Sequence, residues 1–92
     1  MANNGVLVAD YTESEIGILF GQGAIKQVHA VAYAGKWQLL FLTETHSVTL
    51  ISEKSKKARR FASLDTVAAW VRERMGNTAF MVDMRFWDGL PL

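Results

Sequence analysis

The sequence contains no cysteine, which excludes disulfide bonds, thiolate zinc sites and cysteine nucleophiles. It has no apolar run near the roughly 20 residues that a helix needs to cross a bilayer, and residues 1–5 lack the basic start of a secretory signal. The single proline, Pro91, lies in the C-terminal tail. We therefore expect a cytoplasmic protein that does not act at a membrane.

The chain is short, and its charges nearly balance. With 92 residues, half of them apolar and 21% charged, it fits one small domain over residues 1–92, in which residues 1–11 and 87–92 form peripheral tails. The formal net charge is +1. Long-range attraction to nucleic acid is therefore weak, and any positive surface must be local.

Two segments carry the start and stop signals of helices. Polar residues 12–15 precede an apolar stretch that ends at glycines, which predicts a short helix there. A second helix is predicted over residues 63–75, because Ser63 can cap its N-terminus and Gly76 follows its end. One apolar stripe of this second helix should pack on a sheet. Its residues are Leu64, Val67, Ala68, Val71 and Met75.

Between the two helices, β-branched and aromatic residues alternate with polar turns, which is typical of an antiparallel meander. Strands are predicted at residues 25–33, 37–43, 47–51 and 58–61. A last strand at 79–86 follows the second helix, and residues 6–9 form either a strand or an ordered tail. The predicted fold is an α+β domain of order α-β-β-β-β-α-β, in which about five mainly antiparallel strands carry one principal helix on one face.

The sequence lacks the patterns of catalytic and metal-binding sites. His29 and His46 are seventeen residues apart, without the clustered ligands of a metal motif. No serine lies in a nucleophile elbow. The pair Gly21 and Gly23 follows a predicted helix, whereas a dinucleotide-binding loop follows a strand. We therefore predict no enzyme, no catalytic residue, no metal, no cofactor and no small-molecule substrate.

Half of the basic side chains fall within seven residues before the second predicted helix. They are Lys54, Lys56, Lys57, Arg59 and Arg60. Two interpretations remain open: a charged edge that prevents strand-to-strand aggregation, or a surface that contacts an anion such as nucleic-acid phosphate. Strand alternation would place Arg59 and Arg60 on opposite faces. Arg72 on the following helix could extend the positive surface.

Aromatic residues indicate two further possible contacts. Trp37 and Phe41 alternate on a core face, whereas Tyr33 and Trp87 are less constrained, and an exposed aromatic beside positive charge suits single-strand binding. The apolar C-terminal tail, or an open sheet edge, could form a homodimer or partner interface. The tail residues in question are Phe86, Trp87, Leu90 and Leu92.

Several of these features occur together in a known group of proteins. A short helix ending in glycine, the strand at 25–33, Gly35-Lys36-Trp37, and the segment 60–65 before an alanine-rich helix resemble small accessory proteins of bacterial plasmids and integrative elements. Some of these are described as partition-associated, or ParC-like. The resemblance covers about residues 13–84 and leaves both ends without a counterpart.

This resemblance implies a non-enzymatic mobile-element protein that works beside a partition ATPase and its DNA-binding partner. Two functions therefore stay open. The first is a plasmid accessory protein that contacts DNA, or a DNA-bound partition protein, through the basic turn and strand. The second is a protein-interaction module or inhibitor that acts through the apolar tail or a sheet edge, without nucleic acid.

Overall fold

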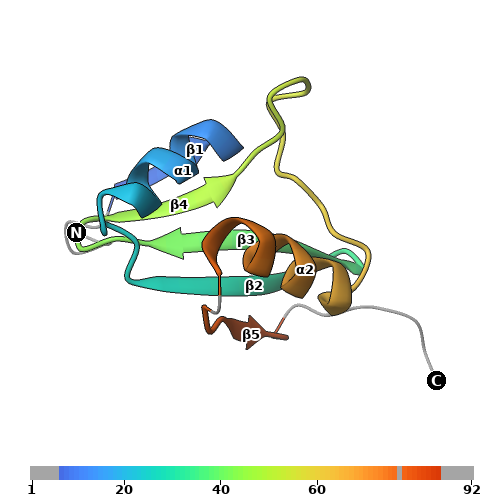
Figure 1. The fold of residues 1–92 in the computed structure, drawn as a ribbon. Coiled ribbons are helices and arrows are strands. Elements are labelled where there is room, and N and C mark those ends of the chain that lie inside the picture. Colours follow the sequence, from blue (N-terminus) through green and yellow to red (C-terminus); the bar gives the residue numbers. More distant parts are fainter. Residues whose placement is uncertain (1–6, 77, 86–92) are drawn as a thin grey trace.

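The computed structural model in Figure 1 describes residues 7–76 and 78–85 and folds them into one five-stranded sheet and two helices. The elements are β1 (Leu7–Tyr11), α1 (Glu13–Gly21), β2 (Gln27–Tyr33), β3 (Lys36–Leu42), β4 (His46–Leu50), α2 (Leu64–Met75) and β5 (Met81–Asp83). The predicted α+β class, with about five strands and one principal helix, is confirmed.

The sheet is mixed rather than mainly antiparallel, with the strand order β1-β4-β3-β2-β5. Strands β2, β3 and β4 form the predicted antiparallel meander. The two outer strands are parallel to their neighbours, β1 to β4 and β5 to β2. The reason is that a helix follows β1 and another precedes β5, and a helical crossover lets the next strand start in the same direction as the last.

Two predicted strands differ from the structure. Residues 58–61 are not a strand, because only the isolated bridges Ile51↔Ala58 and Trp37↔Phe61 hold them. The order of elements is β-α-β-β-β-α-β. Of the two alternatives for residues 6–9, the strand is the one observed, as β1, so residues 7–11 belong to the sheet and not to a peripheral tail. Residues 58–61 are therefore no edge strand, and the interpretation of the basic segment as a charged edge that prevents aggregation stays a prediction.

The last strand is also much shorter than the predicted 79–86 and covers Met81–Asp83. A carboxylate oxygen of Asp83 accepts a hydrogen bond from the backbone N–H of Arg85 at 3.1 Å, which turns the chain away from β2. Of the apolar side chains in this segment, Phe80 is half-buried, whereas Val82 and Met84 are exposed.

The core is one layer between the sheet and the helices. Its sheet residues are Val28, Ala30, Ala32, Trp37, Leu39, Phe41, Val48 and Leu50, and its helix residues are Ile16, Val67, Trp70, Val71 and Met75. Phe61 also belongs to this core. The ring centre of Trp70 lies 6.2 Å from the ring centres of both Phe41 and Phe61. Trp70 was not predicted in this layer, whereas the predicted Ala68 is exposed.

Both helices begin where the polar residues predicted. Thr12 and Glu15 form a capping box at α1, and the Ser63 hydroxyl accepts a hydrogen bond from the backbone N–H of Thr66 at 3.2 Å at α2. Both helices lie on the same side of the sheet (Figure 1). No helix in the described residues covers the other side, which we call the uncovered face. Neither described helix is long and apolar enough to cross a membrane.

Candidate anion-contact surface

The basic segment forms a hairpin that projects from the end of β4 (Figure 1). The backbone N–H of Ser52 donates to the carbonyl of Lys57 at 2.9 Å, which closes the hairpin. At the tip, the Ser52 hydroxyl accepts hydrogen bonds from the backbone N–H groups of Lys54 and Ser55. Lys56 takes the left-handed conformation, with φ of 61°. Local hydrogen bonds therefore hold the tip, and the side chains of Lys54, Lys56 and Lys57 are exposed.

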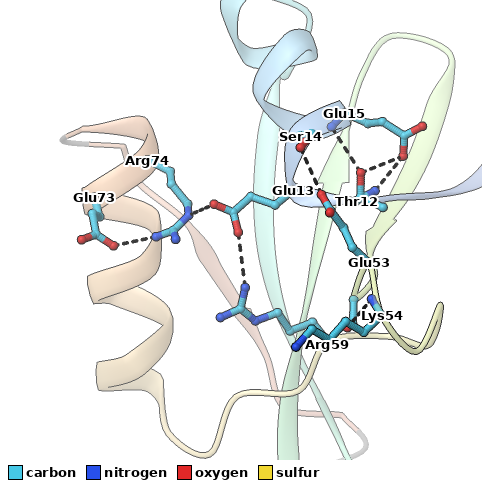
Figure 2. A network of polar contacts seen from close by, with 10 residues as sticks. Thr12, Glu13, Ser14, Glu15, Glu53, Lys54, Arg59, Glu73 and Arg74 are labelled. Carbon is cyan, nitrogen blue, oxygen red and sulfur yellow. Dashed lines mark hydrogen bonds and ion pairs between the residues drawn. The ribbon is translucent and has the colours of Figure 1, made fainter.

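Arg59 lies on the side of this hairpin that faces the helices. Its Nη1 is 3.5 Å from Oε1 of Glu13, at the start of α1, and its guanidinium carbon is 5.2 Å from the centre of the Phe61 ring. The other Glu13 oxygen accepts a hydrogen bond from Nε of Arg74 on α2, and this bond raises the pKa of Arg74. Figure 2 shows the Glu13 carboxylate between the two guanidinium groups. Glu13 therefore offsets part of the charge of Arg59.

A second contact joins α1 to the hairpin on the same side. The Ser14 hydroxyl donates a hydrogen bond to Oε2 of Glu53 at 3.0 Å (Figure 2). A cleft of about 350 Å³ lies here, lined by Glu13, Ile51, Ser52, Glu53, Lys54 and Arg59. Two carboxylates line this cleft, and Glu13 pairs with Arg59. Lys54, which also lines it, forms no ion pair within the described residues.

Arg60 lies on the uncovered face of the sheet. The antiparallel bridge between Trp37 and Phe61 places Arg60 opposite Gln38. Gln38 is half-buried between the buried residues Trp37 and Leu39, so it lies on the uncovered face. The guanidinium carbon of Arg60 is 5.3 Å from the centre of the Tyr33 ring. The predicted separation of Arg59 and Arg60 onto opposite faces therefore holds, although residues 58–61 form no strand.

Tyr33 and Lys36 face each other across the two-residue turn that joins β2 to β3. The turn residues Ala34 and Gly35 have φ values of 52° and 76°, the pair of left-handed conformations that a tight hairpin needs. Tyr33 is 54% exposed. Since β3 begins at the end of the sheet where β4 finishes, this turn and the basic hairpin lie at the same end.

Arg72 does not join the other basic residues. Residues two positions apart on an α-helix point about 200° away from each other. Arg74 points toward Glu13 and the hairpin, so Arg72 points toward the other side of α2. The structure thus separates Arg72 from the hairpin.

We use the name basic end for five cationic residues at the end of the sheet where β4 finishes: Lys36 and Arg60 beside the β2–β3 turn, and Lys54, Lys56 and Lys57 on the projecting hairpin. Within residues 7–76 and 78–85, no carboxylate forms an ion pair with any of them. Sequence reasoning missed Lys36, although an antiparallel meander brings the turn before it to the end where residues 47–51 finish. It also missed the Glu13 carboxylate, which no local pattern connects to Arg59.

Other predicted features are placed as follows. The apolar interface residues Phe86, Trp87, Leu90 and Leu92 lie outside the described residues. In the part of the chain that the structure describes, no group of three or more acidic or histidine side chains could hold a metal ion.

The sequence matches no protein-family model, and no curated protein or solved structure matches it.

Proposed function

We propose that this protein is a non-enzymatic, cytoplasmic DNA-contact protein that binds the phosphate backbone through the basic end. The observation that supports this function best is the placement of five cations, without ion pairs in the described residues, at one end of the sheet, three of them on the projecting hairpin, in a domain whose net charge is only +1. Lysine and arginine contacts to phosphates position a protein on DNA without reading its sequence.

The number of available cations sets the expected strength of binding. If about four of them each neutralise one phosphate, the slope of log affinity against log salt is about −3.6 on duplex DNA. Affinity then falls about 100-fold between about 50 and about 200 mM salt. We propose weak, sequence-independent binding of this kind.

The resemblance to partition-associated plasmid proteins supports a biological setting for this contact. The segment from Arg60 to Asp65 that carries the resemblance contains Arg60 of the basic end and leads into the capped helix α2. In this setting the protein assists a partition ATPase and its DNA-binding partner on plasmid DNA.

Fluorescence polarisation with a labelled duplex tests the proposal. The variant K56Q/K57Q removes two cations of the basic end, and the control K26Q/R72Q removes two cations elsewhere. We expect the first variant to reduce the salt slope by about 1.8, and the control to change it little. Absence of binding at low salt, or an equal effect of both variants, would refute the proposal.

A second candidate function is a protein-interaction module that acts through a sheet edge. Among the described residues β1 pairs only with β4, and its Val8 side chain is 74% exposed. An open edge with an exposed apolar side chain favours strand pairing with another chain. Light scattering on V8K and on the unmodified protein tests this candidate: a dimer that the lysine abolishes supports it, and a monomer at all concentrations contradicts it.

A further inference from the structure

The side chain of Tyr33 is unusual for an aromatic residue in this domain. Among the aromatic residues that the structure describes, it has the largest exposed fraction, 54%, whereas Trp37, Phe41, Phe61 and Trp70 are each 5% exposed or less. Large aromatic side chains normally contribute to a domain by burying their area. Tyr33 therefore adds little to the core, and its ring is available at the surface.

The ring is also held in place before any ligand arrives. Tyr33 is the last residue of β2, paired with Lys36 across the tight turn of Ala34 and Gly35. The guanidinium of Arg60 lies over the ring, with its carbon 5.3 Å from the ring centre. The strand and the tight turn fix the backbone at Tyr33, and the stacked cation restrains the ring, which reduces the conformational freedom that the ring loses when it binds a partner.

We propose that Tyr33 is a stacking site for an unpaired nucleobase, so that the protein prefers single-stranded to duplex DNA; this inference rests on the proposed function. A base stacks on the ring face that Arg60 leaves free. Arg60 and Lys36 contact the phosphates on either side of that base. A duplex cannot offer this contact, because each of its bases is already stacked between neighbours.

The charges on the uncovered face define where the strand runs. The register places Asp10 of β1 opposite Thr49 and Asp83 of β5 opposite Val31, both on the face that carries Tyr33. The Asp10 carboxylate at the β1 edge repels a phosphate backbone, whereas the charge of Asp83 at the β5 edge is offset by its ion pair with Arg85. The cations of the basic hairpin attract the phosphates instead, so the strand leaves Tyr33 toward the hairpin and the contact covers only a few nucleotides.

The test compares a labelled single-stranded oligonucleotide with a duplex of the same sequence, at one salt concentration. Stacking of one base predicts that the single strand binds about 10-fold more tightly. Y33L should lose this preference while its duplex affinity stays the same, and Y33F should keep the preference because it keeps the ring. Thermal denaturation of both variants confirms that each is folded.

A pair of arginine variants gives a matched control. R60Q and R59Q remove the same charge from adjacent residues, but only Arg60 lies over Tyr33. We expect R60Q to weaken single-strand binding several-fold more than R59Q. An equal effect of the two variants would contradict the role assigned to Arg60.

The outcomes separate this inference from the proposed function. If duplex binding depends on salt and on Lys56 and Lys57 but single strands are not preferred, the stacking site is overturned. The proposed DNA contact then still stands. A single-strand preference that survives in Y33L also overturns the stacking site. If neither form of DNA binds at low salt, both proposals fail.

Discussion

Replacing Glu13 with glutamine tests whether one carboxylate links the two helices to the basic hairpin. Glutamine keeps the side-chain length and one acceptor oxygen but removes the charge that attracts Arg59 and Arg74. The three side chains are partly exposed, at 42% for Glu13, 41% for Arg59 and 33% for Arg74. Water and salt screen such pairs, and each contributes about 0.2–1 kcal/mol. We expect the free energy of unfolding to fall by about 1 kcal/mol.

For a domain of this size, a loss of about 1 kcal/mol lowers Tm by about 4–8 °C. DNA binding should change in the opposite direction, because the variant releases Arg59 toward a phosphate. The salt slope on duplex DNA should become steeper by up to about 0.9, the value for one additional phosphate contact. Glu13→Gln is therefore expected to be less stable and to bind more tightly.

Glu44→Gln is the matched control, since it makes the same change of net charge in the turn between β3 and β4. Glu44 is exposed and forms no ion pair within the described residues. Circular dichroism gives Tm, and fluorescence polarisation at two salt concentrations gives the slope. Equal Tm values for the two variants would show that Glu13 adds no stability. An equal gain in affinity would show that net charge, and not release of Arg59, controls binding.

Three further substitutions test the local structure. Ala34→Asn should raise the free energy of unfolding by about 1 kcal/mol, because asparagine tolerates the left-handed conformation at φ of 52° better than alanine; a lower urea midpoint would argue against this turn. Ser63→Ala should lower it by about 1 kcal/mol, because the N–H of Thr66 loses its acceptor, and unchanged urea unfolding would exclude the cap. Hydrogen bonds from Arg85 lower the pKa of Asp83 to about 2, so Arg85→Ala should return it toward 3.8 in an NMR titration. Because the pKa of folded Asp83 lies below its ordinary value, its stabilising effect is complete above that value and disappears as the pH falls toward 2. A midpoint that does not move in Arg85→Ala would rule out this pair.

The helices and the central strands could be predicted from the sequence because their signals are local. The hydroxyl of Ser63 reaches a backbone N–H only three residues away, so its presence before an apolar stripe is enough to mark the start of α2. Alternation likewise identified Trp37 and Phe41 as core residues of β3, since a strand with one covered face buries every second side chain. Trp70 escaped prediction because the buried stripe of α2 is rotated about the helix axis relative to the expected one, so that Trp70 is buried and Ala68 is exposed.

The candidate site could be predicted only in part. The cluster of basic residues was evident, and alternation correctly separated Arg59 from Arg60. That Arg59 pairs with a carboxylate while Arg60 does not was not evident from the sequence. The carboxylate belongs to Glu13, which lies 46 residues before Arg59 and 61 residues before Arg74. The approach of Tyr33 to Arg60 also depends on a bridge between β3 and a segment that is not a strand.

The sequence by itself determined the α+β class, the capped helix α2, the antiparallel meander and the position of the basic segment, because each depends on residues within a few positions of one another. Only the tertiary structure decided that the outer strands run parallel to their neighbours, that Glu13 offsets Arg59, and that Lys36, Tyr33 and Arg60 share one surface. These arrangements depend on how the chain returns to the sheet after each helix and after the hairpin. That path is set by packing of the whole core, and no short stretch of sequence contains it.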